Sequence, residues 1–240
     1  MNAIEIKNLE KKFGDKVAVN KINLEIKEDE LFSLLGVNGA GKTTTIKMLS
    51  CLIKPTSGDA LILGNSVIKN SDKVKKIINL SPQETAVAPN LTVYENLEFI
   101  CGIYEINDRK NKIEEIIKTF KLEDVRNRKS KILSGGYQRR LSIAMAIITE
   151  PKVLFLDEPT LGLDVLARRE LWKIIEKIKE TTTIILTTHY MEEAEMLSDR
   201  VAIMVGGNII ESGTPKELIK KTKAKNFEDA FVKIATKEEE

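Results

Sequence analysis

Residues 36–43 read GVNGAGKT, in which three glycines precede a lysine and a threonine. This is the spacing G-x-x-x-x-G-K-[ST], whose backbone N–H groups surround the oxygens of a nucleotide's phosphates. Gly36, Gly39 and Gly41 allow the backbone to approach such a ligand closely because they carry no side chain. The pattern predicts a phosphate-binding loop. The alternative is a glycine-rich turn that ends in an exposed lysine.

The segments on either side of the loop indicate where it lies in the fold. ELFSLLG (30–36) is a mostly apolar run with the length of a buried strand, and KTTTIKMLSCL (42–52) has helical spacing. Pro55 and Gly58 are expected to end that helix. A loop between a strand and a helix places the positive end of the helix against a bound phosphate, which strengthens the prediction.

The side chains at the end of the loop have separate expected roles. Lys42 would reach the β- and γ-phosphates of a nucleotide, and Thr43 would offer its hydroxyl to Mg²⁺. Thr44 would add another phosphate contact. Asn38 and Ala40 complete the stretch that we expect to bind the nucleotide.

Apolar runs alternate with helical patterns along the rest of the chain. Residues 1–30 alternate apolar and polar side chains, which is typical of antiparallel strands. Four later runs are nearly continuous in apolar character, as strands buried on both faces are: 77–81, 152–157, 182–189 and 200–205. Helical stretches such as 166–180 separate several of these runs, which predicts parallel βαβ units.

We therefore expect one α/β domain over residues 1–240, with a mainly parallel sheet at its centre. Its expected parts are an antiparallel β part (1–30), a core (31–88 and 151–214), an inserted helical lobe (89–150) and a C-terminal helical tail (215–240). The tail ends in KEEE (237–240), a composition typical of disorder.

KVLFLDEP (152–159) is an apolar strand that ends in two carboxylates. The carboxyl ends of parallel strands meet at the edge of the sheet where ligands bind, so Asp157 and Glu158 should lie beside the loop. Asp157 would hold Mg²⁺, directly or through water. Glu158 would act as the general base on the attacking water, a role that contributes about 10²–10⁴-fold to a rate. The alternative is an acidic strand end that caps the next turn.

Histidine and glutamine are scarce in this chain, so their positions are informative. The only histidine, His189, ends the apolar run 182–189, and Gln83 follows the run 77–81 in the same way. Both should then lie at the same sheet edge as Glu158. His189 would bond to the γ-phosphate or orient the attacking water, and Gln83 would contact Mg²⁺ or that water. A lone histidine is more often structural, which is the alternative here.

LSGGYQRR (133–140) opens a predicted helix with a serine and two glycines. Ser134 would cap a helix that begins near Gly135, so that free N–H groups and the positive helix end form a second anion site. One nucleotide does not need two anion sites on the same chain.

Six motifs in a fixed order identify a family: GVNGAGKT, SPQE, LSGGYQ, VLFLDEP, TLGLD and TTH. Together they resemble the ATP-binding subunit of an ABC transporter, and the resemblance runs from Phe13 to about Leu218. It implies an α/β fold with a P-loop NTPase core, an N-terminal antiparallel β part and an inserted helical lobe. It also implies an ATPase whose cofactors are ATP and Mg²⁺.

The resemblance assigns roles that the patterns alone leave open. Phe13 matches the family's aromatic that stacks on adenine, although a core aromatic in a strand is the alternative. Ser134, Gly135 and Gly136 match the signature loop, which binds the γ-phosphate of ATP held by the partner subunit. Asp164 matches a loop that reaches across the dimer interface.

The signature loop departs from the family pattern at one position. Tyr137 stands where glutamine is usual, and Gln138 follows it. This change leaves the glycine N–H groups and the Ser134 hydroxyl in place. Only the contact that the family's glutamine side chain would make is affected.

The resemblance also implies partners and a place in the cell. Two copies, or one copy and a paralogous ATPase subunit, would form a head-to-tail dimer around two Mg-ATP. The dimer would drive separate transmembrane permease subunits through the surface near Gln83 and the helical lobe, at the inner face of the cell membrane. Segments such as 200–219 resemble exporters of drug, antibiotic or lipid type. Importer subunits, soluble ATPases of DNA repair or translation, and an ATP-sensing module without turnover are the alternatives.

The composition argues against other classes of protein. The 38 basic and 36 acidic residues are interspersed and the formal net charge is +2, so we expect no nucleic-acid partner. The sequence contains neither 18 consecutive apolar residues nor the apolar core of a signal peptide, which is typical of a cytoplasmic protein. Cys51 and Cys101 lack metal-type spacing and are expected to be free thiols.

Overall fold

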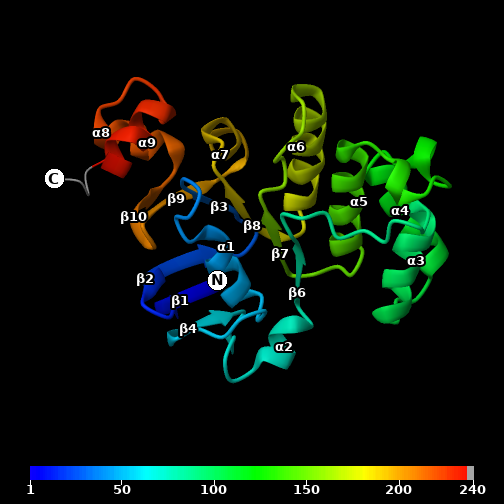
Figure 1. The fold of residues 1–240 in the computed structure, drawn as a ribbon, viewed down its shortest axis with the longest axis horizontal. Coiled ribbons are helices and arrows are strands. Elements are labelled where there is room, and N and C mark those ends of the chain that lie inside the picture. Colours follow the sequence, from blue (N-terminus) through cyan, green and yellow to red (C-terminus); the bar gives the residue numbers. More distant parts are fainter. Residues whose placement is uncertain (237–240) are drawn as a thin grey trace.

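Two β-sheets, a helical lobe and a pair of C-terminal helices make up the fold (Figure 1). The computed structural model describes residues 1–236, so the KEEE segment (237–240) lies outside the described residues. Within the described residues, no helix is both long and apolar enough to cross a membrane.

The smaller sheet is antiparallel throughout. Its strands, in the spatial order β2-β1-β4-β5, are β1 (Asn2–Phe13), β2 (Lys16–Lys27), β4 (Ser57–Ile62) and β5 (Asn65–Ser66). Alternate apolar side chains of β1 and β2 pack together with those of the first helix, which explains the period of two in their sequences. The antiparallel strands expected in residues 1–30 are present, and the structure adds residues 57–66, which the sequence pattern had assigned to the core.

The larger sheet has six strands in the order β10-β9-β3-β8-β7-β6. They are β3 (Leu31–Leu35), β6 (Ile78–Ser81), β7 (Val153–Asp157), β8 (Thr183–Thr188), β9 (Arg200–Val205) and β10 (Asn208–Gly213). All neighbouring strands are parallel except β9 and β10. Every residue of β3, β7 and β8 is buried, which explains their continuous apolar character. The expected α/β fold with a mainly parallel sheet is confirmed.

Four helices belong to the core: α1 (Lys42–Leu49), α2 (Ser71–Lys75), α6 (Val165–Lys179) and α7 (Met191–Leu197). The prediction that Pro55 and Gly58 end α1 is wrong. The helix ends earlier, because Cys51 takes a left-handed backbone conformation with φ 59°. α6 buries Leu171 and Ile175 completely, on the side that the sequence predicted to be apolar.

The helical lobe contains α3 (Val93–Ile103), α4 (Arg109–Thr119) and α5 (Gly135–Ile147), with short 3-10 turns at Glu123–Val125 and Ser130–Ile132. Thr92 and Glu95 form a capping box at the start of α3. Asn96 is fully buried and donates to the Ser130 hydroxyl at 2.9 Å, which joins α3 to the segment before α5. The lobe and one face of the larger sheet share a continuous hydrophobic cluster.

The C-terminal helices α8 (Pro215–Thr222) and α9 (Phe227–Ala235) form the expected helical tail beside β9 and β10 (Figure 1). Phe227 and Phe231 of α9 pack against Leu35 and Ile203 of the sheet. The tail is therefore part of the packed protein up to residue 235.

Strands β3, β7 and β8 end at the same edge of the larger sheet because they are parallel neighbours. Their ends are followed directly by the glycine-rich loop, Glu158 and His189, and β6 leads to Gln83 beside them. The sheet thereby brings together four segments that are far apart in the sequence.

Candidate nucleotide-binding and catalytic site

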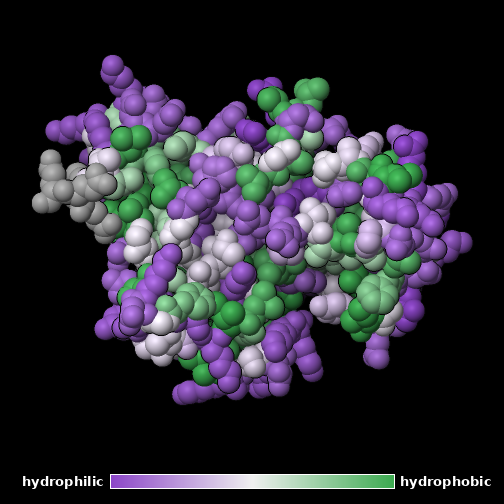
Figure 2. Space-filling model, in the orientation of Figure 1, coloured by the Kyte–Doolittle hydropathy of each residue, from purple (hydrophilic) through white to green (hydrophobic). Residues whose placement is uncertain are grey.

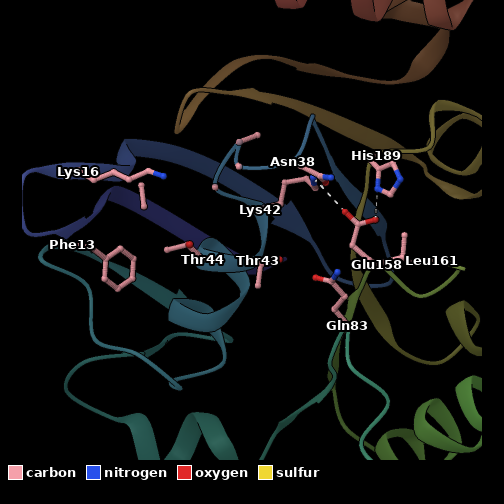
Figure 3. A pocket seen from close by; sticks show the side chains of 14 residues that line it. Phe13, Lys16, Asn38, Lys42, Thr43, Thr44, Gln83, Glu158, Leu161 and His189 are labelled. Carbon is pink, nitrogen blue, oxygen red and sulfur yellow. Dashed lines mark hydrogen bonds and ion pairs between the residues drawn. The ribbon is translucent and has the colours of Figure 1, made fainter.

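A cavity of about 510 Å³ lies at this edge of the sheet (Figure 3). It is lined by Phe13, Lys16, Ala18, Asn38, Gly39, Ala40, Gly41, Lys42, Thr43, Thr44, Gln83, Glu158, Leu161 and His189. Six of the expected site residues are not in its wall, and of these Gly36 and Asp157 each bond to a residue that is. The GVNGAGKT, SPQE, VLFLDEP and TTH motifs therefore converge on one cavity.

Two glycines of the loop satisfy steric demands of the fold. Gly41 has φ 105°, and a Cβ at this position would lie 2.5 Å from the Ala18 carbonyl oxygen of β2. A Cβ at Gly36 would lie 2.3 Å from the Met204 carbonyl oxygen of β9. These glycines therefore let the loop pack directly against strands β2 and β9.

The end of the cavity at β7 and β8 contains a buried ion pair (Figure 3). Lys42 Nζ lies 3.3 Å from Glu158 Oε1 and donates to the Gly36 carbonyl at 2.7 Å. His189 Nδ1 lies 2.8 Å from Glu158 Oε2, and because a carboxylate can only accept, this nitrogen carries the proton. Both oxygens of Glu158 are thus held in place at the cavity wall, where the carboxylate can accept a proton from a water molecule.

Asp157 lies next to the loop rather than in the cavity wall. Thr43 Oγ1 donates to Asp157 Oδ1 at 3.0 Å, and Thr187 Oγ1 donates to the same oxygen at 2.5 Å. A hydroxyl and a carboxylate fit Mg²⁺, which takes one or two protein oxygens together with phosphate oxygens and water. Thr43 and Asp157 would hold this ion, which would supply positive charge beside the β- and γ-phosphates.

Phe13 and Lys16 lie at the opposite end of the cavity from Glu158 (Figure 3). They are cross-strand partners on either side of the Gly14–Asp15 turn. The Phe13 side chain is 53% exposed, and Lys11 Nζ lies 5.1 Å from its ring centroid, so Phe13 is not a core aromatic. An exposed ring at this end of the cavity offers a surface on which a flat base can stack.

Gln83 lines the cavity, and its backbone is held by Arg139, a residue that the sequence motifs did not single out. Arg139 lies on α5, is buried, and donates to the Pro82 carbonyl at 2.7 Å and to the Gln83 carbonyl. Burial lowers the pKa of the Arg139 guanidinium, while the negative charges of Asp157 and Glu193 oppose that shift. Arg139 thus joins the helix that follows LSGG to the Gln83 segment.

Three further residues of the cavity wall were not expected: Lys16, Ala18 and Leu161. The two-residue Gly14–Asp15 turn is a signal that could have placed Lys16 opposite Phe13. No local signal points to Ala18 or Arg139, because each enters the site through contacts between distant segments. Leu161 instead lies in the TLGLD motif, where its N–H donates to the Glu158 carbonyl at 3.2 Å.

The other four expected site residues outside the cavity wall are Ser134, Gly135, Gly136 and Asp164. Ser134 and Gly135 are exposed at the start of α5. Asp164 is exposed at the start of α6, where its Oδ1 accepts from Ala167 N at 2.9 Å. On this chain, the LSGG segment and the phosphate-binding loop therefore do not form a common site.

The start of α5 differs from the prediction in one respect. The helix begins at Gly135 with Ser134 at the N-cap position, as expected, but the Ser134 side chain makes no capping bond. Its carbonyl accepts the first bond of the helix from Gln138 N at 3.0 Å, as the carbonyl of an N-cap residue normally does. The predicted side-chain cap is therefore wrong, because no first-turn N–H group donates to the Ser134 side chain.

The structure gives Tyr137 and Gln138 a place inside the lobe. The Tyr137 ring packs against the hydrophobic cluster of the lobe, with the Arg140 guanidinium 4.4 Å from its centroid. Gln138 Nε2 donates to the carbonyls of Ser130 and Leu133 at 2.9 and 3.3 Å. Both side chains thus support the signature segment from within its own subunit.

Comparisons with known proteins agree with this geometry. A family model described as ABC transporter matches residues 19–161. The chain is 42% identical over 218 residues to the probable multidrug ABC transporter ATP-binding protein YbhF of Escherichia coli, covering 90% of this chain and 38% of that protein. It is 37% identical over 219 residues to the daunorubicin resistance ATP-binding protein DrrA3 of Streptomyces coeruleorubidus, covering 90% of this chain and 69% of that protein. The chain thus spans less than half the length of YbhF.

Solved structures share the fold. A dimeric structure of a post-hydrolysis state of the ATP-binding cassette MJ0796, bound to ADP and Pi, aligns with a TM-score of 0.79 at 29% identity, over 88% of this chain and 98% of that one. An ATP-binding subunit of an ABC transporter aligns with a TM-score of 0.86 at 24% identity, over 97% and 99% of the two chains.

Proposed function

The chain belongs to the ABC transporter family as an ATP-binding domain, and from this premise we propose that it hydrolyses ATP as one half of a head-to-tail dimer that drives a membrane permease. The observation that carries this proposal is the contact of Glu158 with Lys42 and His189 at one end of a cavity of nucleotide size. Such a group of side chains suits hydrolysis of a γ-phosphate, because the lysine stabilises the phosphate charge, the carboxylate can accept a proton from water and the histidine orients the carboxylate.

The two ends of the cavity support one direction of ATP binding. Adenine stacks on the exposed ring of Phe13, and the phosphates extend along residues 38–44 towards Glu158. Lys42 then exchanges Glu158 for the β- and γ-phosphate oxygens, because these carry more negative charge than one carboxylate. This exchange frees Glu158 Oε1 to accept the proton of the attacking water, while His189 keeps the carboxylate oriented through Oε2.

In the proposed dimer, the partner subunit supplies a second set of N–H groups to the γ-phosphate, which the cavity of one subunit does not contain. Ser134 and Gly135 are exposed at a helix N-terminus, where N–H groups and the helix dipole favour an anion. In a head-to-tail dimer, this helix end meets the γ-phosphate bound by the partner, and Asp164 crosses the same interface. The MJ0796 structure is described as a dimer with ADP and Pi, which supports this arrangement.

Release of phosphate from ATP tests the catalytic part of the proposal. Purified protein should release phosphate in the presence of Mg²⁺, and Lys42→Ala should lower the rate by at least about 100-fold, because the lysine stabilises the charge of the transferred phosphoryl group. Lys47→Ala, which removes an exposed lysine of the same helix, is the matched control and should leave the rate unchanged. Tight ATP binding without phosphate release would support an ATP-sensing module instead.

We propose export as the direction of transport. YbhF and DrrA3 are named for multidrug transport and daunorubicin resistance, and the chain aligns with each over 90% of its own length. ATP-binding subunits of importers are the second candidate, and transport measured in inside-out vesicles would distinguish the two.

The outer face of α3 is the surface that we expect the permease to cover. Phe99 and Ile103 lie four residues apart on this helix and are 57% and 58% exposed, and Tyr104 beside them is also exposed. Figure 2 shows hydrophilic side chains over most of the molecule, with hydrophobic ones gathered in patches that include the helical lobe. Apolar side chains left in water on a charged protein are typical of an interaction site.

Replacing Phe99 and Ile103 by serine together should abolish co-purification with a membrane protein encoded by the neighbouring gene. Phosphate release by the isolated protein should stay within about twofold of the wild type, because both side chains already face water. Met196→Ser, on the exposed face of α7, is the matched control and should co-purify normally. Unchanged co-purification of the double variant would place the permease elsewhere.

A further inference from the structure

Glu193 is an acidic side chain at the centre of the protein that the reaction described above does not use. It lies on α7, four residues after His189, and its side chain is completely buried. Trp172 Nε1 of α6 donates to Glu193 Oε1 at 3.1 Å. Glu193 Oε2 and the Thr160 hydroxyl are also buried, and neither has a hydrogen-bond partner within residues 1–236. Buried polar atoms without partners are rare in folded proteins, so this pair needs an explanation.

Glu193 lies near two segments that border the site: the one that follows Glu158 and the one that carries His189. Thr160 lies two residues after Glu158, at the start of the loop that leads to Asp164. The Thr188 hydroxyl, directly before His189, and the Thr160 hydroxyl both lie close enough to lower the pKa of the Glu193 carboxyl. Glu193 therefore touches the segments that carry the base and the histidine.

Burial and the neighbouring hydrogen-bond donors act on the pKa of the Glu193 carboxyl in opposite directions. Burial is the largest influence and raises the pKa of the carboxyl, and the negative charge of Glu158 raises it further. The hydroxyls of Thr188 and Thr160 and the Trp172 indole act in the opposite direction. Hydrogen-bonding groups of three different segments therefore surround this carboxyl, and its charge also acts on the Arg139 guanidinium.

We propose that Glu193 is a positioning residue for hydrolysis, which holds the Thr160–Asp164 loop and the His189 segment in register with Glu158 by bonding to Thr160 when the site closes. The proposal rests on the function proposed above, since it concerns the orientation of Glu158 and His189. The unpartnered Oε2 and the Thr160 hydroxyl are the two atoms that this bond joins, and a small movement of the loop completes it.

The kinetics of two isosteric variants test the proposal. Glu193→Met keeps the volume of the side chain but removes its hydrogen bonds, so kcat for ATP hydrolysis should fall about tenfold or more through loss of orientation. The Kd for ATP should stay within about twofold, because no atom of Glu193 lines the cavity. Glu193→Gln can still accept from Trp172 and can donate to Thr160, and it should retain at least about half of the wild-type kcat.

Trp172 provides a spectroscopic check because it is the only tryptophan in the chain. Its emission should change in Glu193→Met, where the indole N–H loses its acceptor, and should stay close to the wild type in Glu193→Gln. Glu195→Gln, an exposed position on the same helix, is the matched control and should alter neither kcat nor emission.

Several outcomes would overturn the proposal. One is a Glu193→Met enzyme whose kcat lies within about twofold of the wild type, and another is a Glu193→Gln enzyme as slow as Glu193→Met. If Glu193→Met does not fold, Thr160→Val decides the question: it removes only the hydroxyl, and a kcat unchanged from the wild type would refute the bond. The wild-type protein separates the two levels: no phosphate release with Mg²⁺ would refute the proposed function itself, whereas normal wild-type turnover with an equally fast Glu193→Met refutes only the positioning role.

Discussion

Glu158→Gln is expected to lower the rate of ATP hydrolysis by at least about 100-fold, or ~2.7 kcal/mol of transition-state free energy. The amide has the same shape as the carboxylate, but it cannot accept the proton of the attacking water. ATP binding should be preserved, because the cavity and the loop are unchanged. Hydrolysis measured by phosphate release, and binding measured with a fluorescent ATP analogue, would separate these two effects.

The same variant should also trap the ATP-bound dimer. If hydrolysis opens the dimer, a protein that binds ATP without cleaving it accumulates in the closed state, which size-exclusion chromatography with Mg-ATP would detect. Glu176→Gln, an exposed position on α6, is the control and should hydrolyse ATP normally and remain unchanged on the column. Turnover close to the wild type in Glu158→Gln would mean that another group acts as the base.

Ser134→Arg is expected to abolish both the ATP-dependent dimer and hydrolysis, while ATP binding stays within about twofold of the wild type. Ser134 is exposed at the start of α5 and lies outside the cavity wall of its own chain, so the change leaves that cavity intact. In the proposed dimer, a long arginine side chain occupies the space of the partner's γ-phosphate. Chromatography with Mg-ATP in the Glu158→Gln background measures the loss of the dimer directly.

Gly135→Asp tests the same site by charge rather than by size. A Cβ at Gly135 would meet nothing within 4 Å, so the fold accommodates the side chain, whereas a Cβ at Gly136 would lie 3.3 Å from the Ala167 Cβ. The aspartate places a negative charge at the helix end that should meet a phosphate, and the two repel each other. Lys131→Gln, exposed just before the signature segment, is the control. A Gly135→Asp protein that dimerises and hydrolyses normally would refute the division of the site between two subunits.

Much of the site could be predicted from the sequence because its residues lie in, or directly after, recognisable local patterns. The loop at Gly36–Thr43 has a fixed spacing, and Glu158, His189 and Gln83 each follow a recognisable strand. Parallel strands end at a common edge, so their positions in the chain already implied that they meet. The helix boundaries were harder to predict from the sequence. α1 stops at Leu49 because Cys51 adopts a left-handed conformation, and cysteine is not a residue that usually signals the end of a helix.

Contacts between distant segments could not be predicted in the same way. Residues 57–66 complete the antiparallel sheet by pairing with β1, although they follow the phosphate-binding loop in the chain. Arg139 holds the Gln83 segment across the boundary between the helical lobe and the core. In the sequence it is one of two adjacent arginines on a helix, and only packing distinguishes it from the other.

The sequence alone determined which chemistry is expected of this protein, because the glycine-rich loop, the strand-end carboxylate and the signature segment are each defined by neighbouring residues. The tertiary structure alone decided how these parts are held. Lys42 and His189 contact the two oxygens of Glu158, and Glu193 is buried near Thr160. LSGG lies outside the cavity of its own chain. The physical reason is that hydrogen bonds and burial depend on distances across the fold, which leave no periodic trace in a sequence.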